Sequence, residues 1–97
     1  MYRQVELVIS PTAVSCFKND WGYNNGDQVR IFVRYVSGGT EPYGFGIMKD
    51  DPMDPAAVVE ADRVTFYMEN KDVWFLESKQ LKIDCLNGDI VFLVGDA

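Results

Sequence analysis

The segment from residue 37 to residue 44 has the residue types of a ligand-binding turn. It reads Ser-Gly-Gly-Thr-Glu-Pro-Tyr-Gly, joins two runs of β-forming residues and contains no histidine or cysteine that could hold a metal or attack a substrate. Glycine adopts positive φ without strain, so the backbone of this turn can come close to a ligand or a protein partner. We therefore predict a candidate ligand or partner loop made of Gly38, Gly39, Thr40, Glu41 and Tyr43.

The absence of histidine limits the chemistry that the protein can perform. The whole chain has none, which excludes a Ser-His-Asp triad, a Cys-His pair and a histidine-ligated zinc ion. Proton transfer would have to use a carboxylate, lysine, tyrosine or thiol. We predict that the protein is not an enzyme, and we assign it no catalytic residue, no cofactor and no metal ligand.

Three aspartates between residues 50 and 54 offer oxygen ligands of the kind that calcium and magnesium prefer. The segment reads Asp-Asp-Pro-Met-Asp and lacks the glycine and the distal glutamate of a calcium-binding loop. Aspartate and proline are also common in turns for local reasons. We predict that Asp50, Asp51 and Asp54 lie in a solvated turn.

The two cysteines are far apart in the sequence, and neither belongs to a CxxC motif. We predict reduced thiols rather than a disulfide. Cys85 alternates with Leu81 and Ile83, which is typical of a small core residue. Cys16 lies on the flank of an apolar helical stripe, and we predict an exposed thiol without the basic neighbour or second ligand that would make it reactive.

The hydrophobic pattern predicts the elements that position these residues. Residues 4–9 resemble a first strand, and Ser10 and Pro11 are typical of a helix N-cap and a first helical position. The helix then has one apolar face and ends near Gly22. That face consists of Ala13, Val14, Phe17 and Trp21.

Two strands flank the candidate loop. Residues 29–35 alternate, so one face is predicted to lie on the core while Arg30 and Arg34 reach solvent. Residues 45–48 form the partner strand, and its glycines would let another side chain come close.

The second half of the chain predicts two hairpins and a short helix. Residues 58–60 and 64–69 flank a turn, Asn70 caps a brief apolar helix that plugs the core, and Asn87-Gly88 is a two-residue hairpin turn between 81–85 and 90–94. The aromatic residues are predicted to pack mainly in the core. We therefore predict a single domain, residues 1–97, of the α+β, mainly β class, with about seven mostly antiparallel strands in packed sheets, one N-terminal helix and one short helix.

Charge excludes two classes of partner. The net charge is −6, and the nine basic residues are scattered along the chain, so the electrostatic footprint of a nucleic-acid-binding protein is absent. The same charge disfavours an anionic membrane surface. With no apolar signal segment or transmembrane stretch in the sequence, we predict a cytoplasmic protein.

The order of elements and several loop residues resemble the HesB-like family, which has the fold of the A-type iron-sulfur cluster carriers. The resemblance spans nearly the whole chain and is carried by residues 10–13, 26–33, 38–39, 44–45, 50–55 and 74–76. Family carriers place one ligating cysteine directly after the double glycine, where this chain has Thr40, and two more in a Cys-Gly-Cys, which is absent here. Neither Cys16 nor Cys85 falls on a family ligand position. The resemblance is thus to a short branch without the cluster ligands, and it implies partners among iron-sulfur assembly components.

Two functions follow from this reading. The first is a non-catalytic binding or interaction module that has a HesB-like fold and has lost the cluster ligands. The alternative is an iron or iron-sulfur cluster carrier that uses Cys16, Cys85 or a subunit interface unconventionally. The strand at residues 90–94 would need cover at a sheet edge, which a homodimer would provide.

Overall fold

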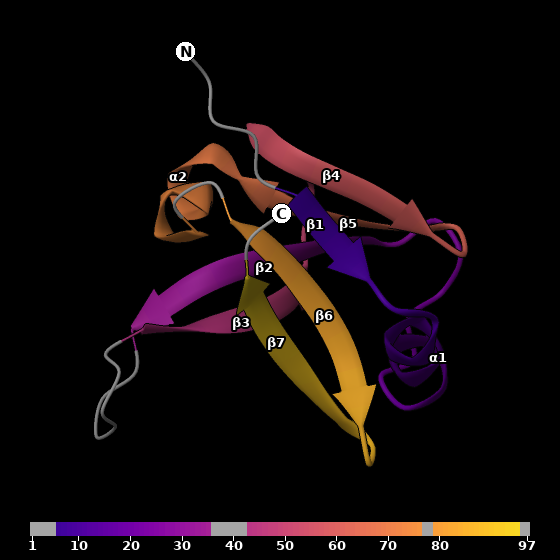
Figure 1. Cartoon of the computed structure of the whole chain (residues 1–97). Helices are drawn as coiled ribbons and strands as arrows, with labels where there is room; N and C mark the ends of the chain where they lie inside the picture. Colours follow the sequence, from indigo (N-terminus) through magenta and orange to yellow (C-terminus); the bar gives the residue numbers. More distant parts are fainter. Residues whose placement is uncertain (1–5, 36–42, 77–78, 96–97) are drawn as a thin grey trace.

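Strands dominate the fold and form two sheets (Figure 1). The computed structural model describes residues 6–35, 43–76 and 79–95. In chain order these ranges contain β1 (Glu6–Ile9), α1 (Pro11–Asn19), β2 (Gln28–Tyr35), β3 (Tyr43–Lys49), β4 (Pro55–Ala61), β5 (Val64–Glu69), α2 (Asn70–Val73), a 3-10 turn (Trp74–Leu76), β6 (Gln80–Leu86) and β7 (Asp89–Gly95). The predicted α+β, mainly β class is confirmed. None of the helices in these ranges is long and apolar enough to span a membrane.

The two sheets have different topologies. One has three strands in the order β1-β6-β7, with β1 parallel to β6 and β6 antiparallel to β7. The other has the order β3-β2-β5-β4, in which two antiparallel pairs are joined by a parallel pairing of β2 with β5. Three of the five pairings in the described ranges are antiparallel, which agrees with the predicted majority.

Helix α1 begins as its sequence predicts. Pro11 is the first helical residue, and the Ser10 hydroxyl accepts a hydrogen bond of 3.1 Å from the Ala13 amide. Phe17 is fully buried, and its ring lies 5.3 Å from that of Phe66 in β5. The helix ends at Asn19, so Trp21 lies beyond it and not on its stripe, and Trp21 is partly exposed.

The core lies between the inner faces of the two sheets. Alternate residues of β2 and β6 are buried there, which confirms the predicted inward faces of both strands. The rings of Phe45 in β3 and Phe92 in β7 lie 5.2 Å apart and join one sheet to the other. Strand β7 ends the three-stranded sheet, and its Leu93 and Val94 are exposed. The predicted homodimer that would cover this edge stays a prediction.

Two tight turns set the hairpins. Asn87 and Gly88 both have positive φ (52° and 84°) between β6 and β7, as the Asn-Gly pair predicts. Asp62 and Arg63 have positive φ (49° and 66°) between β4 and β5. The predicted cap at Asn70 is wrong, because Glu69 occupies the N-cap position of α2 and Asn70 is the first helical residue.

Candidate functional site

Of the predicted candidate loop, Tyr43 belongs to the described residues. Gly38, Gly39, Thr40 and Glu41 lie outside the described residues. Tyr43 is the first residue of β3, where its backbone pairs with that of Tyr35 at the end of β2. The site described below lies elsewhere, on the outer face of the four-stranded sheet.

A segment that crosses this outer face, residues 50–54, is the most distinctive surface feature of the described chain. Strand β3 ends beside the start of β2, and β4 begins beside the end of β5, on the opposite edge of the sheet. The connection between them therefore has to pass over β2 and β5. We call residues 50–54 the strap.

Backbone hydrogen bonds and two buried side chains fix the strap. The Asp50 amide donates to the Gln28 carbonyl at 3.1 Å, and the Tyr67 hydroxyl donates to the Asp50 carbonyl at 2.8 Å. At the other end, the Glu69 carboxylate accepts from the amides of Met53 at 2.8 Å and Asp54 at 2.5 Å. Glu69 is only 4% exposed. A buried carboxylate thus holds the strap on the sheet as a charge-assisted double acceptor.

A row of side chains runs across the sheet beneath and beside the strap. Pairing places Met48, Arg30, Tyr67 and Val58 side by side on β3, β2, β5 and β4. Tyr67 is fully buried, and burial followed by the charges of Asp50 and Glu69 raises the pKa of its phenol. Met48 and Val58 at the two ends of the row are exposed. The row therefore has a covered centre and two apolar ends that face solvent.

The strand position of Arg30 predicts that its side chain reaches solvent, but the structure shows that it does not. Its guanidinium donates to the Asp72 carboxylate of α2 at 2.7 Å, and the two side chains are only 16% and 10% exposed. The hydrogen bond to Asp72 raises the pKa of Arg30. The alternation of β2 correctly places Arg30 on the outer face, but α2 and the strap cover that face.

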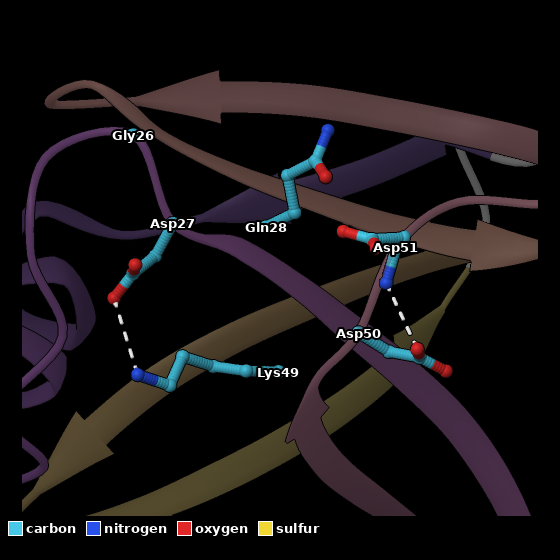
Figure 2. Close-up of a pocket in the computed structure, with 6 residues that line it drawn as sticks. All are labelled: Gly26, Asp27, Gln28, Lys49, Asp50 and Asp51. Atoms are coloured by element: carbon cyan, nitrogen blue, oxygen red, sulfur yellow. Dashed lines mark hydrogen bonds and ion pairs between the residues drawn. The ribbon is translucent and has the colours of Figure 1, made fainter.

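Two cavities adjoin the strap and share Asp50. One, of about 200 Å³, is lined by Arg30, Asp50, Met53, Asp54, Glu69 and Lys71. The other, of about 430 Å³, is lined by Gly26, Asp27, Gln28, Lys49, Asp50 and Asp51, and Figure 2 shows its side chains. In that figure Lys49 reaches Asp27, an ion pair of 3.7 Å, and the Asp51 amide donates to the Asp50 carboxylate at 2.9 Å.

The surface of the strap combines one apolar side chain with carboxylates. Met53 is 89% exposed, and Asp50, Asp51 and Asp54 are all exposed, as the prediction of a solvated turn requires. Within the described ranges, no group of three or more cysteine, aspartate and glutamate side chains could hold a metal ion. This arrangement suits recognition of another surface, because the backbone is fixed and the exposed groups are chemically mixed.

The two cysteines belong to one buried core cluster, which the sequence reading missed. The prediction of a buried Cys85 is confirmed, but the prediction of an exposed Cys16 is wrong, because Cys16 is 6% and Cys85 9% exposed. The Cys16 thiol donates to an Asp20 carboxylate oxygen at 3.5 Å and to the Gly88 carbonyl at 3.7 Å. The influence of Cys85, followed by burial and by Asp20, raises the pKa of Cys16 to about 12. The helical spacing could have indicated this burial, since Cys16 follows the apolar Ala13 by three residues and therefore lies on the same side of the helix.

Comparison with known proteins finds similarity both in sequence and in structure. No model of a known protein family matches the chain. The pyruvate dehydrogenase inhibitor of Bacillus subtilis strain 168 is 33% identical over 81 residues, which cover 81% of this chain and 85% of that protein. The solution NMR structure of a protein from Aquifex aeolicus superposes on this chain with a TM-score of 0.56 and 18% sequence identity, and the match covers 100% of this chain and 97% of that protein. At this identity the match shows a similar fold alone. Neither comparison names the HesB-like family, and that resemblance stays a prediction.

Proposed function

This chain belongs to the family of the Bacillus subtilis pyruvate dehydrogenase inhibitor, and from that premise we propose that it is a non-catalytic binding protein that attaches to pyruvate dehydrogenase and lowers its activity. The relative supplies the target, and the strap supplies the contact surface. The observation that carries the choice of surface is the strap itself, an exposed segment whose backbone is already fixed by Glu69 and Tyr67.

A fixed strap favours tight binding because less conformational entropy is lost when the partner docks. Ordering a mobile side chain at an interface costs about 0.5–1.5 kcal/mol, and ordering a loop costs more. Here the strap amides at Met53 and Asp54 are already bonded in the free protein. Met53 extends from that fixed backbone into solvent and would insert into an apolar pocket of the partner.

The charge around Met53 indicates what the partner surface should carry. Asp50, Asp51 and Asp54 lie in the same strap as the methionine, and the whole chain has a net charge of −6. Complementary charges accelerate association and select the partner more than they add affinity. We therefore propose that the docking site on pyruvate dehydrogenase is an apolar pocket bordered by lysine and arginine, and that binding weakens as the salt concentration rises.

Titration of pyruvate dehydrogenase activity with the purified chain tests this function. The assay follows pyruvate-dependent NAD⁺ reduction by the complex from the same organism, alongside direct binding by interferometry. We expect the wild-type chain to bind and inhibit, and Met53→Ser and Asp51→Lys each to raise the inhibitory concentration about 10-fold or more. Leu86→Ser is the matched control, because Leu86 is also exposed but lies in the other sheet.

The outcomes separate the function from its location. A chain that neither binds nor inhibits the complex would refute the proposed function. Inhibition that is equally strong in the wild type and the two strap variants would keep the function and refute the strap as its surface.

The alternative of an iron or iron-sulfur cluster carrier has one observation in its favour, the presence of Cys16 and Cys85 in one core cluster. Anaerobic incubation with ferrous iron and sulfide, followed by desalting and assay of iron and acid-labile sulfide, tests it. Stoichiometric cluster on the wild type and none on a Cys16→Ser, Cys85→Ser variant would support a carrier. A metal-free wild type would remove this alternative.

A further inference from the structure

The smaller of the two cavities at the strap has room for one large side chain. Its volume is about 200 Å³, its walls are mostly apolar, and it is lined by residues of the strap, β2, β5 and α2. An apolar cavity of about 150 Å³ is enough to hold a benzene molecule. The cavity borders solvent, because four of its six lining residues are exposed, namely Asp50, Met53, Asp54 and Lys71.

The carboxylates around this cavity are not neutralised by the cations that line it. Arg30 is bonded to Asp72 at 2.7 Å, which already balances its charge. Lys71 forms no ion pair within the described ranges. In the same ranges, the hydrogen bonds of Asp54 all use its backbone amide or its carbonyl, so its carboxylate can still accept from a ligand.

We propose that this cavity takes up one lysine or arginine side chain of the target enzyme, with the alkyl stem between the apolar walls and the cationic end at the carboxylates of Asp50 and Asp54. The inference rests on the proposed function, since it names the group that the target contributes. Lysine and arginine suit such a site because their stems pack on apolar surface while their charged ends stay at a polar rim.

The charge of the lining selects a cation over a neutral side chain. A leucine or phenylalanine would fill the apolar space, but it would also remove water from the carboxylates without giving them a new partner, which costs free energy. A cationic end supplies that partner as a charge-assisted hydrogen bond. Glu69 can contribute as well, because each of its oxygens accepts one amide, whereas a carboxylate has about four acceptor sites in all.

Three small probes test the cavity on the free chain, without the target enzyme. They are the N-acetyl methylamide derivatives of lysine, arginine and norleucine, and norleucine has the lysine stem without the ammonium group. The isotope-labelled full chain is titrated with each probe, and NMR follows the amides of Met53, Asp54 and Lys71. We expect the cationic probes to shift these amides saturably with millimolar affinity, and the norleucine probe to bind about fivefold more weakly or less.

Variants of the chain then test whether the target uses the cavity. Asp54→Asn keeps the backbone bonds of Asp54 but removes its charge, and it should weaken binding to pyruvate dehydrogenase about fivefold. Lys71→Met keeps the alkyl stem but removes the positive charge that repels an incoming cation, so it should strengthen binding. Asp89→Asn is the matched control, because it makes the same change of net charge at an exposed residue in the other sheet. Effects of opposite sign at the first two positions would not follow from a loss of folding.

Two results would overturn the proposal. Equal binding of the lysine and norleucine probes, or no shift with either cationic probe, would show that the cavity does not select a cation. Variants that bind pyruvate dehydrogenase as tightly as the wild type would show that the target places no basic side chain here. A wild-type chain that fails to bind the enzyme would instead refute the proposed function, while the probe titration would still decide whether the cavity binds a cation.

Discussion

Replacement of Glu69 by alanine should release the strap from the sheet. The buried carboxylate of Glu69 accepts hydrogen bonds from the backbone amides of Met53 and Asp54. Alanine removes both acceptors and leaves a void where the side chain lay. The two amides can then bond only to water, and the strap backbone loses its fixed position.

The size of the effect follows from these two bonds. A hydrogen bond to a charged group contributes about 1.5–3 kcal/mol, and the strap lies at the surface where water replaces part of the loss. We therefore take the lower value for each bond and expect Glu69→Ala to lower the free energy of unfolding by about 3 kcal/mol. Glu69→Gln keeps one acceptor oxygen and should cost about half as much. For a domain of this size, 3 kcal/mol corresponds to a fall of roughly 12–24 °C in melting temperature.

Urea unfolding combined with hydrogen exchange measures this prediction. The variant should unfold at lower urea with an unchanged slope, and the Met53 and Asp54 amides should exchange faster than the amides of β6. Glu60→Ala is the matched control, because Glu60 is an exposed glutamate on the neighbouring strand β4. A loss below about 0.5 kcal/mol, with unchanged exchange at the two strap amides, would refute the role assigned to Glu69.

Three further predictions concern other contacts. Gly46→Ala should destabilise the fold by about 1–3 kcal/mol, because a Cβ at this position would overlap the Phe32 ring; calorimetry should show partial recovery when Phe32→Ala is added. Arg30→Met should cost about 3–5 kcal/mol by leaving Asp72 buried without its partner, and adding Asp72→Leu should recover most of it in urea unfolding; no recovery would contradict the buried-pair argument. Hydrogen bonds to the Asp84 carboxylate, the stronger from the Ser10 hydroxyl and the weaker from the Cys85 amide, lower the pKa of Asp84 below its usual 3.8. The stabilisation from that carboxylate is therefore complete above pH 3.8 and is lost as the pH falls below this value. In urea unfolding, the Asp84→Asn variant should lose less free energy of unfolding on acidification than the wild type. An acid dependence equal to that of the wild type would contradict this role of Asp84.

Local sequence signals predict the elements of this fold well. The alternation of Leu81, Ile83 and Cys85 correctly predicts the face of β6 that packs in the core. The Asn87-Gly88 pair correctly predicts the turn between β6 and β7. Ser10 starts α1 as predicted. These predictions succeed because each depends on residues within a few positions of one another, where backbone preferences decide the structure.

Contacts between distant segments could not be read in the same way. Arg30 and Asp72 are 42 positions apart, and nothing local distinguishes Arg30 from a solvent-facing strand residue. Glu69 looks like the polar end of a strand, yet it is buried because the strap passes over it. The candidate site depends on such long-range pairings. The predicted binding loop rests on local glycine chemistry, and all of its residues except Tyr43 lie outside the described ranges, so that prediction stays open.

The parallel pairing of β1 with β6 has a consequence for synthesis of the chain. Glu6 pairs with Gln80, and ribosomes add about 5–20 residues per second, so β1 waits roughly 4–15 s for its partner strand to be made. During that interval the apolar face of α1, with Ala13 and Phe17, lacks the cover that β6 supplies in the finished protein. The nascent chain is therefore more open to chaperones and proteases until β6 has been made and has paired with β1.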